Sequence, residues 1–274
     1  MADSGQTPQK LVDNIIDFIN SERELYGDFQ MGGHPGDKDT GEANEQPDPE
    51  HTMNSDSNGG SSAREKPAES DSAGDDVSSV HEQIQQCHTL EELQALCETA
   101  RPLRTDLEGT RLVFGVGNPH ADLMLIGEAP GAEEDRQGEP FVGRAGQLLN
   151  KILASINFSR DDVYIANILK HRPPNNRNPR PEERKRSLPF LLRQIDLVNP
   201  ALILSLGKVS AQTLLGTRSS LTSMRGTFHN FRDNYELLAT YHPAALLRHP
   251  KWKQPTWEDV QMLRKRYDEL GCSP

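Results

Sequence analysis

The segment Gly127–Leu149, with the sequence GEAPGAEEDRQGEPFVGRAGQLL, constrains the fold of this chain more than any other feature. It is rich in Gly, Pro and carboxylates and holds one isolated aromatic residue, Phe141, so its composition is unlike that of a core helix. An apolar run, Asp122–Ile126, precedes it, and a helical pattern, Arg144–Ile156, follows it. Open α/β sheets bind ligands where the chain passes from a strand end to a helix start. The segment therefore predicts a functional site at the edge of such a sheet.

Strand-like and helix-like segments alternate along the chain from Leu112 onward. Before them, Thr89 with Glu92 three residues later forms the pattern of a capping box, which predicts the start of a helix. The alternation predicts an α/β fold of three layers, with a central, mostly parallel sheet covered by helices on both faces. The expected strands are 112–114, 122–126, 163–169, 202–206 and 236–240, and the expected helices are 88–100, 144–156, 181–198, 208–215 and 257–270.

The N-terminal part of the chain, residues 1–82, differs in composition from the rest. Residues 1–27 include an amphipathic helical pattern, Gln9–Tyr26, which either folds back on the body or serves as a detached docking helix for a protein partner. Residues 28–82 carry 14 Asp and Glu against 3 Lys and Arg, a net charge of −11, and very few large apolar residues. Such a segment buries too little apolar surface to offset its chain entropy, so we expect a disordered acidic linker rather than a folded acidic domain. Residues 83–274 then form the globular domain.

Charge and cysteine content narrow the class of protein. The whole chain of 274 residues also carries a net charge of −11, so everything outside residues 28–82 is together about neutral and the overall acidity says little about partners. Its three cysteines form no CxxC pair and no disulfide framework. The sequence contains neither a signal segment nor an apolar run of membrane length. We therefore expect a cytoplasmic protein without a membrane contact, and we expect it to be a monomer.

Polar residues gather where the predicted strands end. The groups are Gly127–Gly143, Asn167–Asn178, Gly207 with Lys208, and His242–Arg248. The carboxyl ends of parallel strands meet at one edge of a sheet, and ligands bind outside that edge. We therefore expect these groups to converge on one site.

Three side chains of these groups suit the recognition of a single base extruded from a nucleic acid. An aromatic face (Phe141) stacks on a base, while an amide (Asn167) and an imidazole (His242) form hydrogen bonds with its edge. The Lys and Arg residues around them suit a phosphate backbone. Taken alone, each residue also fits a structural role: Phe141 as core, Asn167 as a strand end, and His242 as a loop cap. This chemistry leaves a nucleotide hydrolase open as well.

Three motifs, in order along the chain, resemble the signatures of the family 4 uracil-DNA glycosylases. They are GEAPGAEEDRQGEPFVGRAGQLL, NILKHRPPNNRNPRPEE and HPAALLR, and the resemblance runs from about Val113 to Leu270. It implies a uracil-DNA glycosylase-like catalytic domain over residues 83–274. The implied reaction is hydrolysis of the N-glycosidic bond of deoxyuridine in DNA, which leaves an abasic site for base excision repair. Two alternatives stay open: a DNA-binding protein of the same fold that has lost activity, and a hydrolase for another damaged base or a free nucleotide.

The resemblance also implies roles for the residues of the site. Phe141 would stack on the flipped uracil, Asn167 would bond its amide edge, and His242 would stabilise negative charge on its oxygen as the bond breaks. Related glycosylases activate water with an Asp, whose matching position here is Ala129, so another residue must act as the base. Glu134 is the first choice for this base and Glu128 is the second. The loop 246–248 resembles the one that enters the duplex where the base has left. The residues expected to contact DNA are Arg144, Lys170, Arg172, Arg177, Leu247 and Arg248.

The chain departs from that family at the ligands of a 4Fe–4S cluster. Most members hold the cluster with four cysteines, whereas the matching positions here are Arg101, His171 and Ser187. Cys97 is a solitary neighbour of the first of these positions. A cubane cluster needs about four thiolate ligands, and serine and arginine are poor substitutes. We therefore expect no iron–sulfur cluster, no other metal and no cofactor, so that packing or ion pairs must hold the loop that the cluster would fix.

Overall fold

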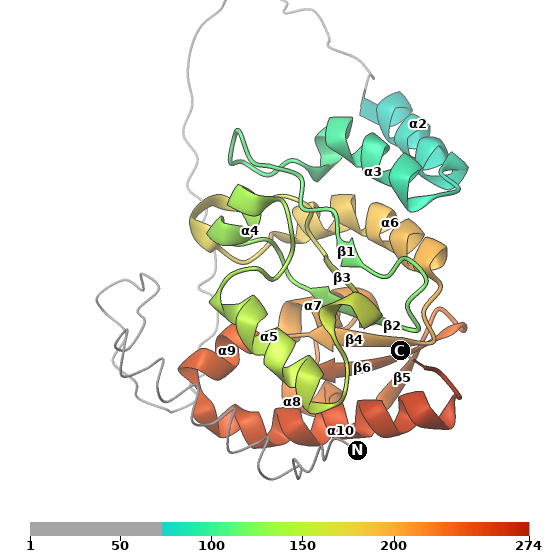
Figure 1. The fold of residues 1–274 in the computed structure, drawn as a ribbon. Helices are drawn as coiled ribbons and strands as arrows, with labels where there is room; N and C mark the ends of the chain where they lie inside the picture. The colour runs from blue at the N-terminus through green and yellow to red at the C-terminus, as the bar shows by residue number, and fades with distance from the viewer. Residues whose placement is uncertain (1–72, 274) are drawn as a thin grey trace, which may run out of the picture.

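A computed structural model describes residues 73–273 of the chain (Figure 1). At its centre lies a six-stranded sheet with the order β1-β3-β2-β4-β6-β5. The inner strands β3, β2, β4 and β6 run parallel, and the edge strands β1 and β5 run antiparallel to their neighbours. The strands are β1 (Val116–Gly117), β2 (Leu123–Gly127), β3 (Tyr164–Asn167), β4 (Leu202–Leu206), β5 (Phe228–Phe231) and β6 (Tyr235–Thr240).

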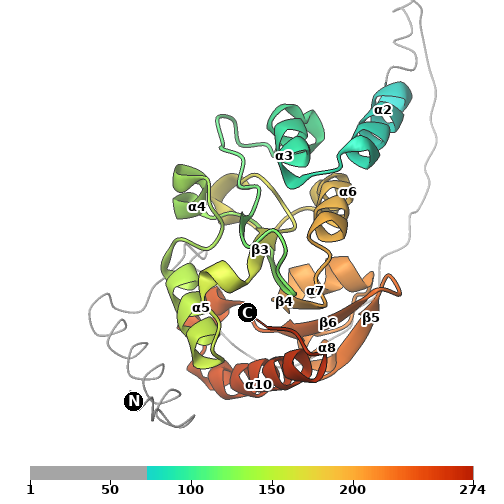
Figure 2. The same cartoon turned by 45° about the vertical axis from the view of Figure 1, so that its right-hand side comes forward.

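Helices cover both faces of the sheet, which confirms the predicted three-layer α/β fold (Figure 2). The side chains of β2 alternate between the faces: Leu123 and Leu125 pack with α5 and α10, whereas Met124 and Ile126 pack with α6 and α7. Both faces of the inner strands are therefore buried, as is usual for a parallel sheet. The helices are α2 (Ala73–Gln86), α3 (Leu90–Thr99), α4 (Ala132–Gln137), α5 (Arg144–Ser155), α6 (Pro181–Val198), α7 (Lys208–Leu215), α8 (Leu221–Met224), α9 (Pro243–Arg248) and α10 (Lys253–Glu269).

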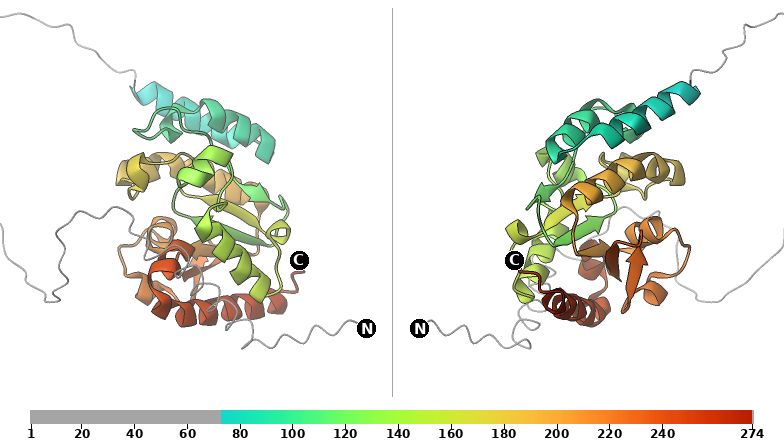
Figure 3. Two further views of the ribbon diagram at one scale, coloured as in Figure 1. Left: turned by 60° about the vertical axis from the view of Figure 1, so that its left-hand side comes forward. Right: turned by 90° about the vertical axis from the view of Figure 1, so that its right-hand side faces the viewer.

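The helices α2 and α3 lie outside α6, away from the sheet (Figure 3). Ile84 of α2 and Leu93 of α3 are buried in one apolar cluster with Phe190 of α6. The start of α3 confirms the predicted capping box, because the Thr89 side chain accepts a hydrogen bond from the N–H of Glu92 and the Glu92 carboxylate accepts one from the N–H of Thr89. These two helices thus extend the fold beyond the three central layers.

The predicted boundary between linker and domain, at residue 82, is wrong. The helix α2 begins at Ala73, inside the segment expected to be disordered. Val80 and Ile84 pack against the α3–α6 layer, and this tertiary contact stabilises a helix that would be marginal alone. The expectations for residues 1–27 and for residues 28–72 lie outside the described residues. Within residues 73–273, none of the helices combines the length and the apolar character that crossing a lipid bilayer requires.

The predicted strand at 112–114 is misplaced by a few residues. Val113 and Phe114 are buried as expected, but the edge strand is β1, which begins at Val116. Phe114 packs into the cluster beneath α2 and α3 rather than onto the sheet. The apolar run at 112–114 therefore packs in the core without forming a strand.

Candidate active site

A cleft of about 980 Å³ lies at the carboxyl edge of the parallel strands. Three of the polar groups predicted to meet there do so, namely those that follow β2, β3 and β6. The remaining group, Gly207 with Lys208 after β4, does not line the cleft, but Gly207 lies against His242, which does. A Cβ atom added at residue 207 would lie 2.9 Å from the Cβ of His242, so the glycine allows the close approach of β4 to that histidine. The convergence follows from the parallel order of the strands.

The end of β6, just before His242, is anchored from α10. Thr240 donates a hydrogen bond to the buried carboxylate of Asp259 at 2.7 Å. Arg225 forms a two-point ion pair with the same carboxylate, with both nitrogen–oxygen distances at 3.0 Å. This network fixes the point at which the chain leaves the sheet and enters the cleft. Sequence analysis did not predict it, because its members are far apart in the chain.

Phe141 forms one wall of the cleft from a turn between α4 and α5. Its φ of 54° lies in the left-handed region, which bulky residues rarely adopt. The ring is buried and lies over Gly127, where an added Cβ atom would come within 2.6 Å of it. The ring of His242 lies 5.4 Å away between centroids, tilted by 30°. Glycine at residue 127 therefore makes room for the aromatic ring beside the histidine.

Asn167 is the last residue of β3 and lies opposite Gly127 in the register of the sheet. Its side chain is 2% exposed, and its Oδ1 atom has no hydrogen-bond partner among residues 73–273. Leaving a buried acceptor unpaired costs about 1–3 kcal/mol, so native structures usually give such an atom a partner or a function. A buried amide oxygen with no partner among residues 73–273 is what we expect of a group that binds a ligand.

His242 caps the N-terminus of α9 and lines the cleft. Its Nδ1 atom accepts a hydrogen bond from the N–H of Ala244 at 3.2 Å, so the proton of the neutral ring is on Nε2. Burial and the nearby Arg248 lower the pKa of His242 to about 4. The ring is therefore neutral at neutral pH and presents an Nε2–H donor. The structural role that its sequence context allows, a loop cap, and the functional role are both compatible with this geometry.

The two carboxylates considered for water activation have different surroundings. Glu134 accepts hydrogen bonds from three main-chain N–H groups: those of Val142 and Gly143 at 3.0 Å and that of Gly131 at 3.1 Å. Its oxygens are thus occupied in joining two parts of the loop. Glu128 also lines the cleft, and burial raises the pKa of its carboxyl group. A raised pKa brings a carboxylate closer to the range suited to a general base, so the geometry favours Glu128 over Glu134.

The prediction that Lys170 contacts DNA is wrong. Its side chain is fully buried, and Nζ donates hydrogen bonds to the carbonyl oxygen of Phe114 at 3.0 Å and to Gln194 at 2.5 Å. Burial lowers the pKa of Lys170 to about 7. The lysine therefore ties the segment before β1 to α6 and has no access to a phosphate. Its position in a basic motif suggested exposure, but the end of β3 directs it inward.

The other residues expected to contact DNA divide into two sets. Arg177 lines the cleft, but its guanidinium is paired with both oxygens of Glu183 at 2.7 and 2.8 Å. Arg172 donates to Asn176 at 2.7 Å, within the same loop. Both arginines therefore help to shape the loop that follows β3. The residues of the second set line the cleft and are Arg144, Leu247 and Arg248.

The residues at the positions of the iron–sulfur ligands do not fit such a cluster. Ser187 donates its hydroxyl hydrogen to the carbonyl oxygen of Ile168 at 2.6 Å, and Arg101 is exposed. His171 is fully buried, as is Cys97, whose thiol has a pKa raised by burial to about 12. A single thiol among these positions falls short of the set of about four thiolates that a cubane cluster needs. Across residues 73–273, no three His, Cys, Asp or Glu side chains gather as a metal site requires.

Arg160 is a residue of the site that sequence analysis missed. It lies in the 3₁₀ helix η2 (Arg160–Asp162), between α5 and β3. Its guanidinium donates hydrogen bonds to the main-chain carbonyl oxygens of Pro140 and Phe141. Nothing in the local sequence SRDD distinguishes this arginine from an ordinary solvated turn, so only the fold brings it to the loop.

Comparison with known proteins assigns this fold and cleft to a family. The sequence profile of the uracil DNA glycosylase superfamily matches residues 114–263, more than half of the chain. The type-4 uracil-DNA glycosylase of Archaeoglobus fulgidus is 40% identical over 161 residues, which span 56% of this chain and 81% of the relative. The type-4 enzyme of Thermotoga maritima is 44% identical over 151 residues, 55% of this chain and 78% of the relative.

A more distant relative is the type-5 uracil-DNA glycosylase of Thermus thermophilus. It is 31% identical over 161 residues, which span 52% of this chain and 73% of the relative. The matched regions contain the strands and loops that build the cleft, and they agree with the motifs quoted from the sequence. The protein therefore belongs to the uracil-DNA glycosylase superfamily.

Proposed function

We propose that this protein is a uracil-DNA glycosylase, which hydrolyses the N-glycosidic bond of deoxyuridine in DNA and leaves an abasic site. The observation that carries the proposal is the buried Oδ1 of Asn167, which has no partner among residues 73–273 and lies in the cleft with Phe141 and His242. The names of two relatives described above, both type-4 uracil-DNA glycosylases, support the same reaction. The substrate is uracil-containing DNA, either single- or double-stranded.

The cleft selects uracil through the amide of Asn167. Uracil presents an N3–H donor beside the O4 acceptor, which complement the Oδ1 acceptor and the Nδ2 donors of an asparagine. Cytosine presents an acceptor at N3 and an amine donor at C4, so the same side chain would face like against like. Stacking of the extruded base on Phe141 supplies affinity that does not depend on this edge. Rejection of cytosine follows because unmatched buried polar groups are costly.

His242 stabilises the leaving group. As the bond between C1′ and N1 breaks, its electron pair passes to the uracil ring and negative charge gathers on O2. The Nε2–H of the neutral His242 donates a hydrogen bond to that oxygen, as the tautomer fixed by Ala244 allows. Because its pKa is about 4, the ring acts as a hydrogen-bond donor and not as a proton source.

Glu128 activates the attacking water. The water oxygen forms the new bond to C1′, and the carboxylate of Glu128 accepts the proton that the water releases. Its pKa, raised by burial, makes this transfer more favourable than it would be for an exposed glutamate. Arg144, Leu247 and Arg248, which line the cleft, contact the DNA around the extruded nucleotide. The enzyme works as a cytoplasmic monomer without an iron–sulfur cluster.

A strand-cleavage assay tests the proposal. Purified protein is incubated with single- and double-stranded oligonucleotides that hold one uracil, and alkali then cleaves the DNA at abasic sites. The matched control replaces that uracil with thymine. We expect scission at the uracil position alone. Binding without scission at stoichiometric enzyme would instead favour the alternative of an inactive DNA-binding protein with this fold.

A further inference from the structure

The turn that carries Phe141 is held by two charged side chains instead of by secondary structure. Arg160 donates hydrogen bonds to the carbonyl oxygens of residues 140 and 141, the latter at 3.1 Å. Glu134 accepts hydrogen bonds from the N–H groups of residues 142 and 143, each at 3.0 Å. Consecutive peptide groups are thus bound on one side by a cation and on the other by an anion, which strengthens each hydrogen bond. We call Arg160 and Glu134 together the turn clamp.

The conformation of this turn requires such support. The φ of 54° at Phe141 places a bulky residue in the left-handed region, which is unfavourable by itself. Gly146 of α5 lies directly against the turn, where an added Cβ atom would come within 1.8 Å of the carbonyl oxygen of Phe141. The turn therefore packs closely against α5. Without the turn clamp, the main chain at residue 141 can relax from its left-handed conformation, and the ring of Phe141 would move with it.

We propose that Arg160 and Glu134 are positioning residues, which hold the ring of Phe141 where the extruded base stacks. This inference rests on the proposed function. It gives Glu134 a task other than activation of water, and it assigns a role to Arg160, which does not line the cleft. The clamp acts through Phe141 and does not contact the reacting atoms.

The clamp should affect the rate of bond cleavage more than the affinity for DNA. Displacement of a positioning group by about 1 Å can lower a rate by about a hundredfold. DNA affinity depends largely on phosphate contacts, which the clamp does not make. We therefore expect Arg160→Ala to lower the single-turnover rate by about a hundredfold. The dissociation constant for abasic-site DNA should change by less than about threefold, because those contacts remain.

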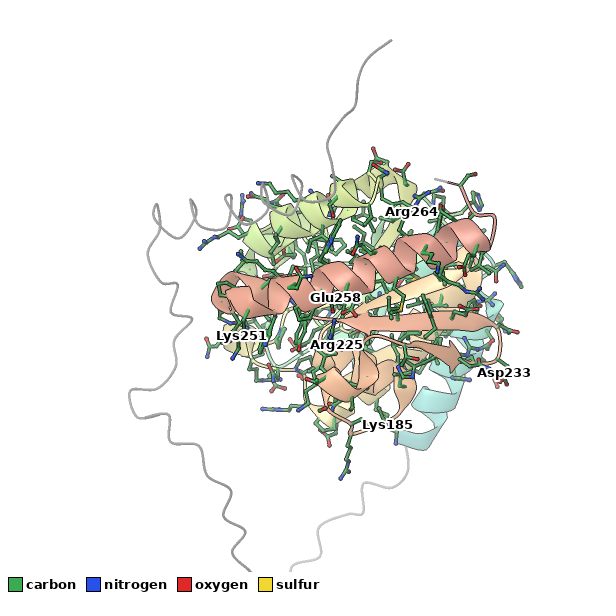
Figure 4. All side chains as sticks on the ribbon, turned by 90° about the horizontal axis from the view of Figure 1, so that it is seen from below. Lys185, Arg225, Asp233, Lys251, Glu258 and Arg264 are labelled. Carbon is green, nitrogen blue, oxygen red and sulfur yellow. The ribbon has the colours of Figure 1, made fainter. Side chains whose placement is uncertain are left out.

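The matched control is Arg264→Ala. Arg264 lies on α10 (Figure 4), and its guanidinium packs over the ring of Phe158 at 4.9 Å. It is therefore a structural arginine of the same domain that does not touch the turn. Arg264→Ala should keep the wild-type cleavage rate, even if it lowers the melting temperature. Equal rate losses in the two variants would overturn the proposal.

Two further measurements separate the clamp from a general structural role. If Arg160 acts through Phe141, the double variant Arg160→Ala with Phe141→Ala should be no slower than Phe141→Ala alone. Guanidinium ion at concentrations too low to denature should restore part of the rate of Arg160→Ala and none of the rate of Phe141→Ala. Fully additive losses, or an absence of rescue, would contradict the assignment.

Hydrogen exchange tests the clamp without any reference to catalysis. The N–H groups of Val142 and Gly143 donate to Glu134, so Glu134→Gln and Arg160→Ala should speed their exchange at least tenfold. Amides of β4 should keep their protection in both variants. Fast exchange together with an inactive wild-type enzyme would preserve the clamp and reject the proposed function. Unchanged exchange in both variants would reject the clamp itself.

Discussion

At the scale of single residues, the cleft contains polar side chains whose tautomer and position are set by the main chain around them. His242 is held as one tautomer by the N–H of Ala244. Asn167 lies at the end of β3, and its Oδ1 has no partner within the described part of the chain. The arrangement of Asn167 lowers the stability of the fold, since an unpaired buried acceptor carries a cost. Such features are expected where stability is given up for preorganised binding.

Asn167→Asp or His242→Ala should lower the single-turnover rate by about two to three orders of magnitude, comparable to the loss of an oxyanion donor. DNA affinity should change much less, because phosphate contacts dominate it. Rapid-quench kinetics beside binding titrations would measure both quantities. Asn118→Asp, in a turn away from the cleft, is the matched control. Equal losses in rate and affinity would mean that the two residues are structural.

The lowered pKa of His242 predicts how stability responds to acid. Its pKa is about 4 in the folded protein against an ordinary 6.5, so the folded state disfavours the charged ring. Above pH 6.5 the ring is neutral in both states; as the pH falls from there towards 4, only the unfolded state gains the proton. The free energy of unfolding should then decrease by up to about 1.4 kcal/mol per pH unit from this residue. Denaturant titrations of wild type and His242→Gln should show a shallower acid loss in the variant, and parallel curves would contradict the assignment.

At the scale of elements, the helix α9 brings two adjacent leucines to different places. Leu246 is 2% exposed and belongs to the main apolar cluster, whereas Leu247 lines the cleft. Of the loop 246–248 that resembles a duplex-entering segment, only the last two residues are therefore placed to meet DNA. Sequence similarity identified the loop, but the helical geometry of α9 decides which leucine faces the cleft.

Leu247→Ala should lower kcat/KM on double-stranded DNA by about tenfold, since a duplex must be unpaired before its base enters the cleft. Single-stranded DNA, which needs no unpairing, should be cleaved at nearly the wild-type rate. Leu246→Ala is the matched control: it should cost about 2–5 kcal/mol of stability and affect both substrates alike. Parallel assays on the two substrates would settle the comparison, and an equal loss for Leu247→Ala would show that it does not act on the duplex.

The elements that sequence predicts well are those whose apolar pattern is complete within the element. The bounds of β4, α6 and α7 agree with the predicted ranges, because each presents an apolar face to the core at a regular period. The helix α4, AEEDRQ, has no buried residue and is not among the predicted helices; it is capped through Glu134 and Gly131. The strand β5 is a short edge strand with only one fully buried residue, so it gave no alternating signal.

The site, too, could be predicted only where the sequence itself carries a recognisable pattern. The resemblance identified Phe141, Asn167 and His242, whose placement in one cleft follows from the parallel strand order. The resemblance also led to the wrong prediction that Lys170 contacts DNA. The motif KHRPP does not reveal that its first residue, Lys170, points into the core. Arg160 was not found, since its partners are main-chain carbonyls of a distant turn and carry no side-chain pattern. Contacts to the main chain are the part of a site that residue types alone do not reveal.

At the scale of the whole molecule, the correction at α2 changes where the chain can be shortened. Deletion of residues 28–72 should leave the melting temperature and the glycosylase rate nearly unchanged, because a segment of this acidic composition has very few large apolar residues to contribute to a core. DNA binding should stay the same or tighten, since negative charge is removed. A longer deletion, to residue 86, removes Ile84 from its apolar cluster and should destabilise the domain by about 2–5 kcal/mol. Thermal melts of both truncated proteins would test this, and a large loss from the shorter deletion would place the boundary earlier.

Iron content tests whether this protein lacks the 4Fe–4S cluster that the resemblance to the family 4 enzymes implies. The chemistry of Arg101, His171 and Ser187 offers no set of thiolates, so we expect a colourless protein with far less than four irons per chain. Its melting temperature should not respond to chelators, whereas a cluster-dependent fold would couple metal and stability. Metal analysis and visible absorption of anaerobically purified protein would measure this.

The control variant for iron is Cys97→Ala. Its thiol is fully buried and does not complete a set of about four thiolates, so the change should remove packing volume without altering the metal content. A brown protein with near-stoichiometric iron and sulfide would contradict the prediction. Loss of that iron in Cys97→Ala would then identify this cysteine as a ligand, with the buried Cys87 as the next residue to replace, because both lie in the apolar cluster between α3 and α6.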